Sequence, residues 1–133
     1  MTPSEIGERA EAAVLAALVG IGKQVLLPFG ERRYDLAYEE NGRLVKVQCK
    51  AGSVRKGAVC FRTHSVGRST VRDYREDVDF FGVYCHGREE VYLVPVGDVP
   101  LRRASLRLTP ARNGQTSGVR MAGRYLLRNG EVR

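Results

Sequence analysis

The sequence predicts an α/β protein in which one amphipathic helix is followed by about six strands of a mixed β-sheet. The first twenty residues repeat apolar side chains at helical spacing. The segments that follow alternate apolar and polar residues or form short apolar runs, and they show little further helical periodicity. At 133 residues, with 43% hydrophobic and 28% charged residues, the chain is expected to form a single domain over residues 1–133.

The helix is predicted over residues 3–19. Thr2-Pro3-Ser4-Glu5 is a capping box, with Thr2 as the N-cap, proline at the first helical position and Glu5 three residues after the cap. Gly20 and Gly22 favour termination of the helix at its other end. The apolar stripe between these ends consists of Ile6, Ala10, Ala13, Val14, Ala17, Leu18 and Ile21.

The strands are predicted in order along the rest of the chain. Apolar or alternating runs occur at residues 23–28, 33–39, 43–50, 58–62, 78–85 and 90–96. The last two runs are mostly apolar and predict buried central strands joined by a tight turn. The segments between and after them predict a basic loop at residues 51–57, a short helix near residues 71–76, and a strand at residues 106–109.

A hairpin in the first half of the chain carries the most informative side chains. Asn-Gly between alternating runs is a strong signal for a two-residue turn, because both residues tolerate positive φ. A turn at Asn41-Gly42 places Asp35 opposite Gln48, with Lys50 on the same face. The opposite face is expected to be core, and it carries Tyr34, Leu36, Tyr38, Val45, Val47 and Cys49.

An acid, an amide oxygen and a cation on one face suit a divalent metal and a phosphate. Asp35 can act as a bridging carboxylate, Gln48 can add its side-chain oxygen, and the Cys49 backbone carbonyl is a natural third ligand. Lys50 can orient or deprotonate a water, or stabilise the charge that develops on the phosphate. Glu8, in the first turns of the helix, can add a second carboxylate through a water. The alternative is a surface hairpin with a weak ion pair, and an acid that only favours the helix dipole.

Positive charge is concentrated in two segments. Residues 101–133 hold eight arginines and one acid, and they carry the whole formal net charge of +7. Residues 43–75 hold nine basic residues and one acid. Arginine binds phosphate bidentately, so both segments favour a nucleic-acid partner, with a solvated basic face as the alternative. The candidates for phosphate contacts are Arg55, Lys56, Arg62, Arg102, Arg103, Arg107, Arg112, Arg120 and Arg124.

Other features narrow the class of protein. No apolar run approaches the roughly 20 residues that span a bilayer, and the N-terminal residues do not resemble a signal peptide. A cytoplasmic protein with no membrane partner is therefore expected. Three cysteines without a C-x-x-C pair predict buried thiols rather than disulfides or a zinc site. Asp79, His64 and His86 are expected to be structural.

The order of these residues resembles that of the PD-(D/E)XK restriction-like nucleases. In that family an acid on the first helix precedes an aspartate and then a strand that ends in an acid or amide, any residue, and lysine. The matching segments here are Gly7-Glu8, Arg33-Tyr34-Asp35-Leu36 and Val47-Gln48-Cys49-Lys50. Residues 25–30, 78–84, 91–95 and 106–115 are also similar to the group I intron-associated endonucleases of this family, some of which carry Gln at the second acid position. Holliday junction resolvases are similar in size and motif order, but they typically have Glu where this chain has Gln48.

The resemblance implies a restriction-endonuclease-like fold, with a central mixed β-sheet flanked by helices. It implies Mg²⁺-dependent cleavage of double-stranded DNA by a homodimer or homotetramer, with Mn²⁺ as a substitute metal. The implied catalytic residues are Glu8, Asp35, Gln48 and Lys50. The implied metal ligands are Glu8, Asp35, Gln48 and the Cys49 carbonyl, so the uncharged Gln48 leaves metal affinity to the two acids.

Three alternatives stay open. A resolvase would recognise the shape of branched DNA rather than a sequence. A DNA-binding module could keep the fold without catalysis, with the Gln48 amide as the sign of that loss. An enzyme acting on RNA is less favoured, because nothing here resembles an aromatic-rich platform for RNA bases.

Overall fold

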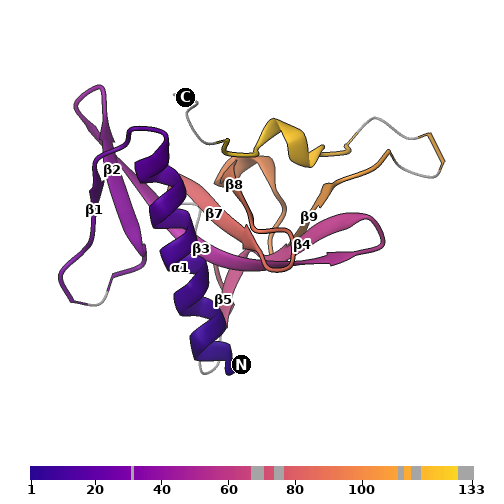
Figure 1. Ribbon diagram of the computed structural model, residues 1–133, viewed down its shortest axis with the longest axis horizontal. Helices are drawn as coiled ribbons and strands as arrows, with labels where there is room; N and C mark the ends of the chain where they lie inside the picture. Colours follow the sequence, from indigo (N-terminus) through magenta and orange to yellow (C-terminus); the bar gives the residue numbers. More distant parts are fainter. Residues whose placement is uncertain (31, 67–70, 74–76, 111–112, 115–117, 129–133) are drawn as a thin grey trace.

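A long α-helix lies across one face of a mixed β-sheet (Figure 1). The computed structural model describes residues 1–30, 32–66, 71–73, 77–110, 113–114 and 118–128. The helix, α1, spans Pro3–Gly20, and two 3₁₀ helices, η1 and η2, span Val96–Asp98 and Ala122–Arg124. The strands are β1 (Val25–Leu26), β2 (Leu36–Glu40), β3 (Arg43–Arg55), β4 (Ala58–Arg62), β5 (His64–Val66), β6 (Val71–Asp73), β7 (Phe80–Cys85), β8 (Glu90–Pro95) and β9 (Arg103–Arg107).

The strand β3 is the centre of the seven-stranded sheet. The order along one path is β1–β2–β3–β4–β9, while β7 pairs with β3, and β8 pairs with β7. The β3–β7 pair is parallel and the other pairs are antiparallel, which confirms the predicted mixed sheet. Of the flanking helices that the resemblance implies, α1 is the one α-helix in the part of the chain that the structure describes. No helix in that part is long and apolar enough to cross a membrane.

The helix α1 begins and packs as its sequence predicts. Thr2 Oγ1 accepts a hydrogen bond from the Glu5 backbone N–H at 3.1 Å. The stripe that includes Val14 and Leu18 is fully buried against the sheet. The closest approach is at Gly82 of β7, where an added Cβ would lie 2.6 Å from Val14 Cγ1. Only glycine therefore permits the observed distance between the helix and the sheet.

The predicted register of the Asn-Gly hairpin is confirmed over β2. Leu36 pairs with Val47, and both turn residues have positive φ, 52° and 77°. The strand ends at Leu36, however, so the predicted cross-strand pair of Asp35 with Gln48 does not form.

The face of the hairpin that was predicted as core packs beneath α1. Leu36, Tyr38, Val45, Val47 and Cys49 are buried in one cluster with the helix. Tyr34 was predicted on the same face, but it packs instead against a second buried cluster, which includes Val59, Phe81 and Leu106. The reason is that Tyr34 precedes the strand, where the alternation of faces no longer holds.

The strand β3 is longer than predicted. Residues 51–55 continue it, rather than forming a basic loop, because they pair with β7 and then with β4. A Cβ at Gly52 would lie 2.9 Å from Val59 Cγ1 and 3.0 Å from Val83 Cγ1. This glycine therefore allows close packing within the sheet, and the turn is confined to the next hairpin residues, Lys56 and its neighbour, both with positive φ.

Three smaller predictions were wrong in their extent. The strand predicted at residues 23–28 is limited to Val25–Leu26. Residues 71–73 form β6, which pairs with β5, rather than part of a helix, while residues 74–76 lie outside the described part. β9 covers Arg103–Arg107 rather than residues 106–109, since it pairs along the whole of β4.

Candidate active site

Asp35 lies where β2 separates from β3. Its Oδ2 accepts a hydrogen bond from the backbone N–H of Cys49 at 2.8 Å, and its own N–H donates to the carbonyl of Val47 at 2.9 Å. The carboxylate is therefore held at the edge of β3, beside the strand residues that carry the predicted amide and lysine. Burial raises the pKa of Asp35, against the opposing effects of the Cys49 N–H and the positive charge of Lys50.

A second carboxyl group, Glu11 of α1, interacts with Asp35. Each group affects the pKa of the other: Asp35 raises the pKa of Glu11, and Glu11 lowers that of Asp35. Burial, the interaction with Asp35 and the charge of Glu8 all raise the pKa of Glu11. A cation bound beside the two carboxyl groups would offset the repulsion between their charges.

Glu11 is an acid that the sequence interpretation did not single out. Both Glu11 and the predicted Glu8 are exposed on α1, and the charge of Glu8 raises the pKa of Glu11. A helical wheel gives the signal that was overlooked. At about 100° per residue, Glu11 lies roughly 60° from the centre of the stripe Ala10, Val14 and Leu18, whereas Glu8 lies roughly 120° away. Glu11 therefore lies nearer than Glu8 to the face of α1 that packs on the sheet.

The donor atoms gathered here are hard oxygens. The structure relates two of them directly, the carboxyl groups of Glu11 and Asp35. Gln48 is half-buried on β3 opposite Phe81, and Cys49 bonds to Asp35 through its backbone N–H, so the Gln48 amide oxygen and the Cys49 carbonyl oxygen stay predicted ligands. The described residues contain no group of three or more His, Cys, Asp or Glu side chains placed to hold a metal. The set fits Mg²⁺ because that ion prefers oxygen, binds through one or two carboxylates and keeps open positions for substrate and water.

Lys50 completes the group further along the same strand. Its Nζ donates a hydrogen bond to the carbonyl of His64 at 3.1 Å. Burial lowers the pKa of Lys50 to about 8, Arg62 and Arg33 act in the same direction, and Asp35 opposes them. A lysine with this pKa can lose its proton at mildly alkaline pH, which an exposed lysine does not do.

Three of the predicted phosphate-binding residues lie with Lys50 around one concavity. Arg55 of β3, Arg62 of β4 and Arg103 of β9 line it together with Lys50. Its volume is about 320 Å³. The long course of β3 explains this arrangement, because one strand carries both the lysine and an arginine of the cleft.

The other predicted arginines have different surroundings. Arg107 is tied to backbone carbonyls of Lys56, Thr109 and Pro110, so it fixes the turn after β9. Arg124 lies over the ring of Tyr125, with its Cζ 5.7 Å from the ring centroid. The remaining described candidates do not line the concavity that contains Lys50. Lys56 and Arg102 lie at turns with positive φ, and the Nε of Arg120 is buried. Arg112 is outside the described residues.

The residues expected to be structural do hold the framework. Asp79 accepts a hydrogen bond from the Lys46 backbone N–H at 2.9 Å, which joins the start of β7 to β3. His64 Nδ1 lies 2.8 Å from the carbonyl of Arg102, so it positions the chain that leads into β9. His86 stacks edge-on against Tyr84, with ring centroids 4.6 Å apart.

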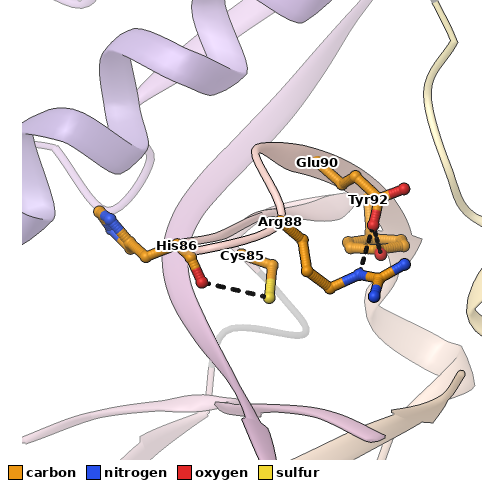
Figure 2. Close-up of polar contacts among 5 residues, drawn as sticks. All are labelled: Cys85, His86, Arg88, Glu90 and Tyr92. Carbon is orange, nitrogen blue, oxygen red and sulfur yellow. Dashed lines mark hydrogen bonds and ion pairs between the residues drawn. The ribbon is translucent and has the colours of Figure 1, made fainter.

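The turn between β7 and β8 contains a polar cluster of its own (Figure 2). Glu90 accepts hydrogen bonds from the Arg88 guanidinium and from Tyr92 Oη. The buried thiol of Cys85 donates to the carbonyl of His86 at 3.8 Å. The hydrogen bonds of Glu90 and Cys85 stabilise the hairpin, whereas the buried Nε2 of His86 has no hydrogen-bond partner among the described residues.

The comparisons with known proteins agree with this geometry. A model of the PD-(D/E)XK endonuclease family matches residues 1–128. The chain belongs to this family. A solved structure described as a bacterial homing endonuclease, I-Ssp6803I, is similar with a TM-score of 0.68 and 25% sequence identity, over 94% of this chain and 86% of that chain. The predicted family and its restriction-endonuclease-like α/β fold are thus confirmed, while no curated protein gave a significant match.

Proposed function

We propose that this PD-(D/E)XK endonuclease hydrolyses phosphodiester bonds of double-stranded DNA in a reaction that depends on Mg²⁺. One observation carries the proposal. Lys50 interacts electrostatically with Asp35, which interacts in turn with Glu11, and Lys50 also lines the concavity that holds the arginines. The acids alone would repel a phosphate, so they require a cation beside it. The lysine and arginines would attract the same phosphate.

Each residue then has a defined task. Bound at Glu11, Asp35, Gln48 and the Cys49 carbonyl, Mg²⁺ or Mn²⁺ would supply positive charge that acidifies water and offsets the charge of the phosphate. Neutral Lys50 accepts a proton from the attacking water as the water oxygen bonds to phosphorus. The bond from phosphorus to the leaving oxygen breaks, and that oxygen takes a proton from solvent. Glu8 supports the site from outside through its charge on Glu11.

The similar structure is that of a homing endonuclease, and this similarity favours site-specific cleavage of duplex DNA over resolution of junctions. Cutting both strands needs two sites, which supports the predicted homodimer or homotetramer. A DNA substrate also agrees with the predicted cytoplasmic location. The resolvase and the inactive DNA-binding module remain the alternatives that an experiment must separate.

The first experiment is a cleavage assay with Mg²⁺ on genomic-scale duplex DNA and on a synthetic four-way junction. Discrete duplex fragments that disappear with Lys50→Ala would support the proposal. Symmetric cutting of the junction alone would instead identify a resolvase. Binding without cutting, on DNA that contains the target site of the chain, would identify the inactive module.

Glu11 and Glu8 are separated by a matched pair of variants. Glu11→Gln should raise the Mg²⁺ concentration needed for half-maximal cleavage by about 10–100-fold, because it removes a ligand beside Asp35. Glu8→Gln should change it only a few-fold, since Glu8 lies farther from the buried stripe of α1 and acts on Glu11 through its charge. A larger effect of Glu8→Gln than of Glu11→Gln would indicate that Glu8, and not Glu11, is the metal ligand.

A further inference from the structure

Two arginines face each other across the β4–β9 pair. Arg62 and Arg103 are direct partners in the antiparallel register, so both side chains emerge on the same face. Like charges directly opposite each other destabilise a sheet. Neither guanidinium forms an ion pair with a carboxylate in the part of the chain that the structure describes. The fold therefore tolerates a repulsion that an external anion would relieve.

The surroundings of this pair are those of an anion site. The pair lines the concavity of about 320 Å³ together with Lys50 and Arg55, and none of the described residues that line it is acidic. That volume lies at the lower end of the ~300–1,000 Å³ typical of small-ligand sites, which suits one phosphate group with part of its sugar. Ser53 and the half-buried thiol of Cys60 complete the polar lining.

The position of the concavity relates it to the carboxylate pair. Lys50 lines the concavity with Arg62, and it interacts electrostatically with both Asp35 and Arg62. A strand of DNA whose scissile phosphate lies at Lys50 would therefore bring its next phosphate toward the arginines. Two guanidinium groups can hold one phosphate through several parallel hydrogen bonds, which a pair of lysines cannot do.

We propose that Arg62 and Arg103 together bind a single backbone phosphate of the cut strand, adjacent to the scissile phosphate. This inference rests on the proposed function for the identity of the polymer. The predicted phosphate-binding arginines then fall into two groups. Arg62 and Arg103 share one site on β4 and β9, whereas others, such as Arg107, use their guanidinium to bind backbone carbonyls.

The number of phosphates can be counted from the salt dependence of binding. The slope of log affinity against log salt changes by about 0.9 for each phosphate of duplex DNA that the protein neutralises. Without divalent metal, the double variant Arg62→Gln/Arg103→Gln should reduce the magnitude of the slope by about 0.9. The matched double variant Arg43→Gln/Arg128→Gln, at exposed positions outside the concavity, should change it far less. Removal of the repulsion should leave the melting temperature of the first variant no lower than that of the wild type.

Three results would overturn the inference: an unchanged slope, a reduction of about 1.8 that indicates two separate phosphates, or an equal reduction in the matched control. The native thiol of Cys60 gives a second measurement, because Cys49 and Cys85 are buried. Duplex DNA should slow labelling of Cys60 in the wild type and protect it less in the arginine double variant. Absence of protection in the wild type would also contradict the site.

These measurements are independent of catalysis. A wild-type chain that binds and protects Cys60 but never cuts with Mg²⁺ would reject the proposed enzyme and keep the phosphate site. A wild-type chain that cuts, with an arginine double variant that binds and cuts normally, would reject the phosphate site alone.

Discussion

Gly82→Ala tests whether the spacing between α1 and the sheet determines the active site. The added Cβ would lie 2.6 Å and 3.2 Å from the two methyl carbons of Val14, and 3.1 Å from Val47 Cγ1. Both valines are fully buried, so neither can turn into empty space. The helix must move away from the sheet by on the order of 1 Å, and overpacking of this kind costs about 1–3 kcal/mol.

The cost should appear in the melting temperature and should depend on Val14. For a chain of this size, 1 kcal/mol corresponds to about 4 °C, so Gly82→Ala should lower the melting temperature by roughly 4–12 °C. Val14→Ala alone should cost about 2 kcal/mol through the loss of two buried methyl groups. In the double variant the new methyl group occupies the space that Val14 leaves. The double variant should therefore be about 1 kcal/mol more stable than the sum of the single effects predicts.

Urea and thermal unfolding of the metal-free protein, followed by circular dichroism, would measure all three variants. Gly123→Ala is the control, because nothing lies within 4 Å of its added Cβ. The helix also carries Glu11, so Gly82→Ala should weaken cleavage at temperatures where it remains folded. Strict additivity in the double variant, or a Gly82→Ala effect no larger than that of Gly123→Ala, would refute this reasoning.

Three further predictions concern charge. Burial raises the pKa of Asp35 in the folded state, so ionisation of Asp35 destabilises the fold as pH rises. Asp35→Asn should abolish cleavage, yet it should raise the melting temperature of the metal-free protein at pH 7. This difference in melting temperature should vanish below about pH 4, where Asp35 is protonated in both the folded and unfolded states. If neutral Lys50 accepts the proton, the single-turnover cleavage rate should rise with pH and level off near pH 8, whereas a rate that falls over this range would exclude that role. Arg107→Lys should lower the unfolding free energy by about 1 kcal/mol, because an ammonium group cannot reach all the carbonyls that the guanidinium bonds, and the salt slope of DNA binding should not change.

Local signals predicted the helix and the hairpin well. The capping box at Thr2 and the Asn-Gly turn act within a few residues, so they can be recognised without knowledge of the rest of the fold. The length of β3 could not be predicted in this way. Residues 51–55 are strand because β7 and β4 pair with them, and Gly52 indicates a loop until its tertiary neighbours are known.

The candidate site shows the same division. Three predicted site residues could be selected from the sequence because they lie close together in one hairpin. Gln48 and Lys50 lie on β3, and Asp35 lies just before β2, the hairpin partner of β3. The choice between Glu8 and Glu11 depends on which face of the helix meets the sheet, and the burial of Ala10 and Val14 favours Glu11. The grouping of Arg62 with Arg103 depends on the β4–β9 pairing, which joins positions forty-one residues apart and has no sequence signal of its own.

The connections of β3 also imply an order of assembly. Its links to β2 and β4 each close over a two-residue turn, whereas the contact of Val14 with Gly82 joins distant parts of the chain. Short loops close faster than long ones, so we expect the hairpins that carry Lys50 to form before α1 docks. Docking of α1 brings Glu11 to Asp35, and it is the step that places two acids together at a cost. The two hairpins would therefore place Lys50, Arg55 and Arg62 before Glu11 meets Asp35.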